Sequence, residues 1–234
     1  MTLITPVVLE LPFRGTWRTE MSPARRVPSH GTHLFGVTYA VDFVAVDERG
    51  RSAPPGWRAW LAAEAPETFR GFGQPLLAPA AGTVAAVHDG EPDHVGRRSQ
   101  LTLLPYLLGQ PARVRRGIGA IAGNHVVIAL GPTGPFVALV HLQLGSLRVD
   151  VGDVVAVGDQ VAKCGNSGNS TEPSVHIQVT DSAEWSRARG LPIVFRAYRS
   201  VTTGAVVERG MPGESEIIEA VVSAGSPPDP RTRD

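Results

Sequence analysis

Short apolar runs recur along the chain, and Gly, Pro, Asn or Asp bounds each of them. The runs are rich in Val and five to ten residues long, which is typical of β-strands. They predict strands at residues 7–13, 38–47, 82–90, 124–130, 135–142, 153–157, 160–165 and 174–181. Strands spaced so closely favour a mainly β fold built on an antiparallel sheet or sandwich.

Two segments interrupt this pattern. Residues 51–73 form a Pro-containing insertion, within which residues 57–65 predict one short helix. Residues 89–118 are expected to form a long surface excursion, and the polar, Pro-rich residues 224–234 predict a disordered tail. No repeat or change in composition marks a boundary, so residues 1–223 are expected to form a single domain that carries both insertions.

Composition narrows the possible functions. The chain has 234 residues, of which 26 are Gly and 20 are Pro, so it is rich in turns, and a chain of this length buries roughly 70% of its unfolded surface. Its 22 basic and 22 acidic residues cancel, so no overall field draws it to nucleic acid or to an anionic membrane. No apolar run approaches the roughly 18 residues of a membrane span. The first residues lack the basic and apolar regions of a signal peptide, so the sequence predicts a cytoplasmic protein without nucleic-acid or membrane partners.

The strongest local pattern lies at residues 152–179, which read GDVVAVGDQVAKCGNSGNSTEPSVHIQV. It predicts two strands joined by a Gly-Asp turn, and then a tight polar loop in which glycines permit positive φ angles. The strand that follows places Ser174 and His176 on one face, because strand side chains alternate with a period of two. The single cysteine, Cys164, lies in an apolar run here, which favours a buried and unreactive thiol.

At these residues the chain resembles the lysostaphin-type (LytM-like) zinc metallopeptidases, many of which cut peptidoglycan cross-bridges. The resemblance spans about residues 36–180. Its ordered blocks are YAVDF (39–43), GQPLLAPAAGTVAAV (73–87), GNHVVIAL (123–130), VALVHL (137–142), the Gly-Asp run from 149 to 170, and PSVHIQV (173–179).

The resemblance implies the fold of that family, the duplicated hybrid motif, which is a mainly antiparallel β domain with a cleft across its sheet. It also implies a hydrolase that binds Zn²⁺ and cleaves peptide bonds in peptidoglycan-type peptides through a zinc-activated water. Action outside the cell or at the cell wall is implied by the resemblance alone.

Position by position, the resemblance assigns Asp42 and His176 as metal ligands. His141 matches a histidine that is not a ligand, and we expect it to stabilise the developing oxyanion. The sequence departs from the family twice. The ligand position four residues before Asp42 holds Thr38, and the first His of the family's H-x-H pair is Ser174, which can only orient a water.

These departures predict an impaired site, because catalytic zinc normally has three protein ligands and because Ser174 does not titrate near neutral pH. The segment SHGTHLFG (29–36) offers a replacement ligand, since a Gly-containing loop can fold back and bring His30 or His33 to Asp42 and His176. We take His30 as the candidate third ligand.

Two other functions remain open at this point. A catalytically inactive binding or regulatory module would keep the cleft and lose the chemistry. A biotinyl- or lipoyl-type carrier domain shares the Gly-Asp hairpins but needs a lysine at a hairpin tip, whereas the only lysine, Lys163, lies in a predicted strand.

Overall fold

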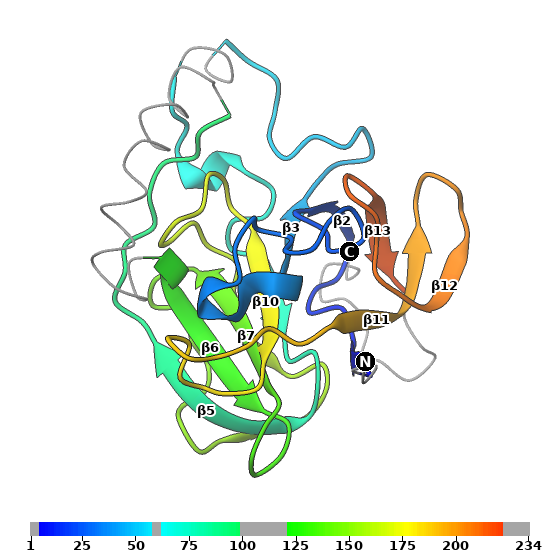
Figure 1. Cartoon of the computed structure of the whole chain (residues 1–234). Helices are drawn as coiled ribbons and strands as arrows, with labels where there is room; N and C mark the ends of the chain where they lie inside the picture. Colours follow the sequence, from blue (N-terminus) through cyan, green and yellow to red (C-terminus); the bar gives the residue numbers. More distant parts are fainter. Residues whose placement is uncertain (1–4, 58–61, 99–120, 222–234) are drawn as a thin grey trace.

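The computed structural model describes residues 5–57, 62–98 and 121–221. Strands dominate this part of the chain, which confirms the expected mainly β class (Figure 1). The strands are β1 (Val7–Leu9), β2 (Thr16–Glu20), β3 (Val41–Ala45), β4 (Pro75–Leu77), β5 (Gly82–His88), β6 (Asn124–Ala129), β7 (Phe136–Leu142), β8 (Val154–Val155), β9 (Gln160–Lys163), β10 (Val175–Thr180), β11 (Ile193–Ser200), β12 (Val206–Gly210) and β13 (Ile217–Ala220). Two 3₁₀ segments, η1 (Leu34–Tyr39) and η2 (Pro66–Thr68), accompany them.

One large sheet organises the described chain. Its strand order is β1-β11-β13-β2-β3-β10-β7-β6-β5-β8, and β12 pairs with β11 off this path. The pairs are antiparallel except for β1 with β11, which run parallel. The central strands β3, β10 and β7 therefore come from distant parts of the sequence and lie side by side.

The main hydrophobic core lies behind these central strands. One face of the sheet buries every second residue, among them Phe43, Leu139 and Ile177, each fully buried. Against this face packs the small sheet of β4 and β9, which contributes the buried Leu76 and Val161. The result is a two-layer β structure whose other sheet face remains available for a cleft.

The main hydrophobic core also contains Cys164. Its side chain is fully buried, and burial raises the pKa of the thiol, the charge of Asp93 adding to the effect. A thiol in this environment stays protonated near neutral pH, in agreement with the unreactive cysteine that the sequence favoured.

The opposite face of the sheet is partly covered by the segment before β3. In Figure 1 the η1 ribbon crosses in front of β10. Gly36 of η1 packs so closely on the Thr180 side chain that a Cβ at residue 36 would overlap it. Phe35 and Gly36 adopt φ angles of 57° and 77°, so the segment turns sharply where it meets the sheet.

All eight strands expected from the Val-rich runs are present, although several are shorter than the run that predicted them. β2, β11, β12 and β13 were not anticipated, because charged residues interrupt their apolar positions. β4 was not anticipated either, because it has only three residues and begins with a proline. The helix expected at 57–65 is wrong for residues 62–65, which are not helical, because Glu64 forms an antiparallel β-bridge with Gly96. Residues 58–61 of that segment lie outside the described residues. So do most of the 89–118 excursion and the tail at 224–234.

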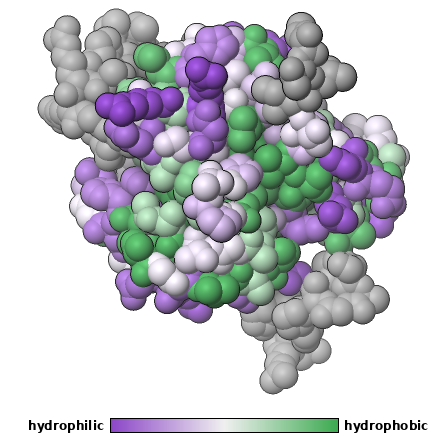
Figure 2. Space-filling view, turned by 60° about the horizontal axis from the view of Figure 1, so that its bottom comes forward, coloured by the Kyte–Doolittle hydropathy of each residue, from purple (hydrophilic) through white to green (hydrophobic). Residues whose placement is uncertain are grey.

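Apolar and polar groups are interspersed on the molecular face seen in Figure 2. Exposed large apolar side chains of the described chain include Leu34 and Val154. Within the described residues, every helix is too short or too polar to cross a bilayer.

Candidate metal and catalytic site

Asp42 and His176 are neighbours across two central strands. Asp42 of β3 lies directly opposite His176 of β10 in the antiparallel register. Directly opposed residues point to the same sheet face, and here that face is the one away from the main core. The imidazole Nδ1 of His176 lies 2.8 Å from Oδ1 of Asp42.

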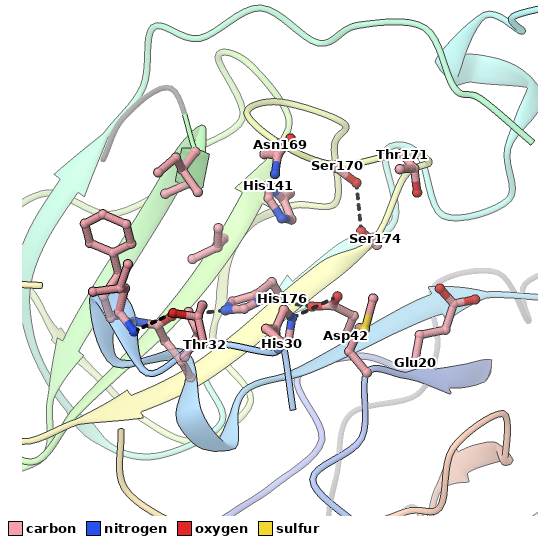
Figure 3. Close-up of a pocket in the computed structure, with 18 of the residues that line it drawn as sticks. Glu20, His30, Thr32, Asp42, His141, Asn169, Ser170, Thr171, Ser174 and His176 are labelled. Carbon is pink, nitrogen blue, oxygen red and sulfur yellow. Dashed lines mark hydrogen bonds and ion pairs between the residues drawn. The ribbon is translucent and has the colours of Figure 1, made fainter. Parts of the chain in front are cut away.

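His30 reaches the same point from the loop before η1. Its Nε2 lies 3.3 Å from Oδ2 of Asp42, and its ring centroid lies 4.8 Å from that of His176. The candidate ligand atoms of the three residues all fall within 4.8 Å of one another (Figure 3). In the described chain this is the one group of three or more His, Cys, Asp or Glu residues with such spacing. That it binds a metal stays a prediction.

The other candidate for the missing ligand, His33, and the substituted position, Thr38, lie elsewhere. Nδ1 of His33 lies 3.1 Å from Oγ1 of Thr38, so these two residues contact each other. Thr38 packs against Gly190, where an added Cβ would lie 3.0 Å from the Thr38 Cβ. The structure therefore brings His30 to Asp42, and it leaves both His33 and Thr38 outside the group.

The hydrogen bonds around His30 fix which of its nitrogens carries a proton. The Ser29 hydroxyl donates to the carbonyl of Val37 at 3.2 Å, so its oxygen accepts from Nδ1 of His30 at 3.0 Å. In the neutral ring Nε2 is then unprotonated, and its lone pair faces a carboxylate oxygen of Asp42. A proton on Nε2 turns this contact into an ion pair with Asp42, and a metal ion would take the place of that proton.

Electrostatics favour a charged Asp42–His176 pair in the metal-free protein. Burial alone would raise the pKa of Asp42, but the charges of His30 and His176 and their hydrogen bonds hold it well below its usual range. Burial would lower the pKa of His176, yet the Asp42 charge and hydrogen bonds to Asp42 and Gln178 raise it. A metal ion at this point would replace the proton on Nδ1 of His176.

His141 reaches the cleft through a β-bulge. In the β6–β7 pairing, Asn124 opposes Leu142 and His125 opposes Val140, so His141 is the extra, unpaired residue. It adopts a φ of 66°, in the left-handed region. Val140 and His141 therefore both face the cleft, whereas a regular strand would have pointed the histidine into the core.

The proton on His141 is placed by its backbone contact. Nδ1 lies 2.9 Å from the carbonyl of Ser167, which can only accept, so Nδ1 carries the hydrogen and Nε2 is unprotonated. Burial, reinforced by the neighbouring His176, lowers the pKa of His141 to about 3. At neutral pH its Nε2 can accept a proton. Donation to an oxyanion, the role expected from the resemblance, would first require protonation.

Ser174 faces the cleft two residues before His176, as strand alternation predicted. Its Oγ lies 3.0 Å from Oγ of Ser170, and the Ser170 hydroxyl donates to the carbonyl of Glu172 at 2.6 Å. The serine therefore joins a hydroxyl pair at the cleft wall (Figure 3).

The cleft around these groups has a volume of about 400 Å³. Met21, Leu34 and Phe35 contribute apolar side chains to its lining, while Glu20 and Glu172 add carboxylates.

Gln178 was not anticipated as a site residue. Its Oε1 lies 3.0 Å from Nε2 of His176, and its Nε2 donates to the carbonyl of Phe35 at 3.0 Å. The period of two that placed Ser174 beside His176 also places residue 178 on that face, so the sequence held the signal.

The donor set fits zinc. Two imidazole nitrogens and one carboxylate oxygen match the three-ligand composition of catalytic zinc sites, and the nearby cleft leaves room for a further ligand. The other ring nitrogen of His30 contacts the Ser29 hydroxyl, and that of His176 contacts the Gln178 amide oxygen, as the second nitrogen of a ligating histidine almost always does.

Comparison with known families bears on this arrangement. The model of peptidase family M23 matches residues 112–187, about a third of the chain. Over these residues the chain is similar to peptidase family M23. The matched segment contains His141, Ser174 and His176, whereas His30 and Asp42 lie upstream of it.

Solved structures of M23 peptidases resemble the chain at low identity. The catalytic domain of lysostaphin from Staphylococcus simulans is 18% identical, with a TM-score of 0.37 over 68% of this chain and 80% of that one. A variant catalytic domain of the prophage-encoded M23 protein EnpA from Enterococcus faecalis is 18% identical, with a TM-score of 0.38 over 65% and 73%. The deep-sea M23 metalloprotease pseudoalterin is 12% identical, with a TM-score of 0.41 over 80% and 76%. No curated protein matches the chain.

The family indicates a zinc metallopeptidase type of function.

Proposed function

We propose that the protein is a zinc metalloendopeptidase that hydrolyses peptide bonds in peptidoglycan-type peptides. The observation that carries the proposal is the position of His30. Because its Nε2 lies 3.3 Å from Asp42, the loop at residues 29–36 supplies the ligand that Thr38 cannot. The site then has three protein ligands despite the substitution.

A zinc ion held by His30, Asp42 and His176 would lower the pKa of water and polarise a peptide carbonyl. The protein itself would supply the proton acceptor. Nε2 of His141 is unprotonated at neutral pH and faces the cleft that holds the metal candidates, with its ring centroid 5.9 Å from that of His176. It would accept a proton from the attacking water and later return it to the leaving amine.

Ser174 replaces a second proton-transfer group and can only orient a water. Since one general acid–base group typically contributes about 10²–10⁴-fold to a rate, we expect turnover below that of a site with both histidines.

Ser174 also supports a second candidate function, a binding or regulatory module that keeps the cleft without turnover. Such a module would bind wall peptides saturably and release them unchanged.

One experiment separates the two functions. Purified protein, with its metal content measured, is incubated with soluble peptidoglycan peptides, and the products are followed by mass spectrometry. The peptidase proposal expects about one zinc per chain, and cleavage that is lost in Asp42→Ala and falls at least 100-fold in His141→Ala. His88→Ala, a histidine outside the cleft lining, is the matched control. Saturable binding of the peptides without any cleavage would establish the module instead.

A further inference from the structure

Gln178 joins the two parts of the candidate metal site. It is one of the most deeply buried polar residues of β10, with 3% of its surface exposed. Its amide oxygen faces Nε2 of His176, and its amide nitrogen donates to the carbonyl of Phe35 in η1. One side chain therefore contacts both a candidate ligand and the segment that follows His30.

The first of these contacts selects the ligating nitrogen of His176. Because the Gln178 nitrogen is committed to the Phe35 carbonyl, its oxygen is the atom that faces the imidazole, and Nε2 of His176 must donate to it. The hydrogen on Nε2 leaves Nδ1 as the atom with a lone pair for a metal. Nδ1 is also the nitrogen that lies 2.8 Å from Asp42.

The second contact holds the loop that delivers His30. The left-handed φ of Phe35 occurs where its carbonyl meets Gln178, and Gly36 then packs on Thr180 of the same strand. On the other side of this turn, Val37 accepts from the Ser29 hydroxyl, which in turn accepts from His30. A continuous set of contacts thus connects Gln178 with the orientation of His30.

We propose that Gln178 is a positioning residue that orients His176 through Nε2 and anchors the His30 loop through Phe35, and so sets the affinity for zinc. This inference rests on the zinc site of the proposed function but not on catalysis. Outer-shell partners of this kind typically change metal affinity by 10–100-fold.

Two substitutions separate the two contacts. Gln178→Leu removes both of them. Gln178→Glu keeps an acceptor for Nε2 of His176 but cannot donate to Phe35. Thr19→Val is the matched control, because Thr19 is a buried polar residue of β2 that is not among the residues lining the cleft.

Zinc dissociation constants are measured by competition with a chromophoric chelator, and unfolding is monitored in parallel. We expect Gln178→Leu to weaken zinc binding about 10–100-fold. Gln178→Glu should recover at least half of that loss on a logarithmic scale, and Thr19→Val should bind as the wild type does. In the zinc-free protein, NMR should also show a protected Nε2 proton on His176 that disappears in Gln178→Leu.

Each result decides a different question. Wild-type affinity in Gln178→Leu, or equal losses in the Leu and Glu variants, would overturn the role of Gln178 and leave the peptidase proposal standing. Tight zinc binding without peptide cleavage would refute the peptidase proposal and leave this role intact. A wild-type protein that binds no zinc would overturn both.

Discussion

The histidine that completes the metal site can be tested by a pair of substitutions at His30 and Thr38. His30→Ala removes one of three candidate ligand atoms and leaves Asp42 with a single histidine partner. Structural zinc sites with four protein ligands bind with about 10–16 kcal/mol, or about 3 kcal/mol for each ligand. A loss of about 3 kcal/mol raises the dissociation constant by roughly 10²-fold.

The double variant His30→Ala, Thr38→His places a histidine at the spacing that the family uses. We expect it not to restore binding. The Thr38 side chain contacts His33 and packs against Gly190, and residue 38 lies outside the residues that line the cleft. A larger side chain there would have to displace the chain around Gly190 before it approached Asp42.

Zinc affinity would be measured by chelator competition, with folding checked by circular dichroism. His33→Ala is the matched control, because it removes a histidine from the same loop that lies outside the ligand group, and its affinity should stay within about threefold of wild type. Equal zinc affinities for His30→Ala and His33→Ala would refute the reasoning, and so would full rescue by the double variant.

Two further predictions concern stability. For the zinc-free protein, the free energy of unfolding should be greatest near pH 6.5. The raised pKa of His176 stabilises the fold below pH 6.5, and this stabilisation is lost as the pH rises through the pKa of the folded state. The pKa of His141 is lowered to about 3, so a fall in pH below 6.5 favours unfolding by up to about 1.4 kcal/mol per pH unit. Chelator-treated protein unfolded in urea from pH 4 to 9 tests this, and an acid limb that is as steep in His141→Asn would contradict it. Leu139→Ala, at a fully buried position of β7, should cost about 2–5 kcal/mol and lower the Tm by about 5–15 °C. Val154→Ala, at an exposed position, should change stability by under about 0.5 kcal/mol, and a similar loss in both variants would place Leu139 outside the core.

The strands could be predicted from the sequence where turn residues bound an apolar run on both sides. β6, β7 and β10 are Val-rich runs between turn residues, and the central sheet was anticipated on that basis. β2 could not be found in this way, because its sequence TWRTE alternates between one buried and one partly exposed position and uses charged residues for the latter. Its pairing with β3 stabilises it, and pairing between distant segments leaves little trace in a local pattern.

The candidate site divides in a similar way. The period of two along β10 predicted that Ser174 and His176 share one face. The same period also places Gln178 on that face. His141 departs from this alternation, because a β-bulge turns its side chain to the cleft face, whereas in a regular β7 it would point into the core. A single extra residue reverses the orientation of a side chain, and no pattern in VALVHL marks where it occurs.

By itself, then, the sequence determined the β class, most of the central strands, and the pair Asp42 and His176. Each of these depends on residues close in the chain or on a motif with fixed spacing. Only the tertiary structure decided that His30, twelve residues before Asp42, approaches it while Thr38, four residues before it, turns away. The path of a loop is set by where it packs, here on Gln178 and Thr180 of β10, and those contacts join segments more than a hundred residues apart.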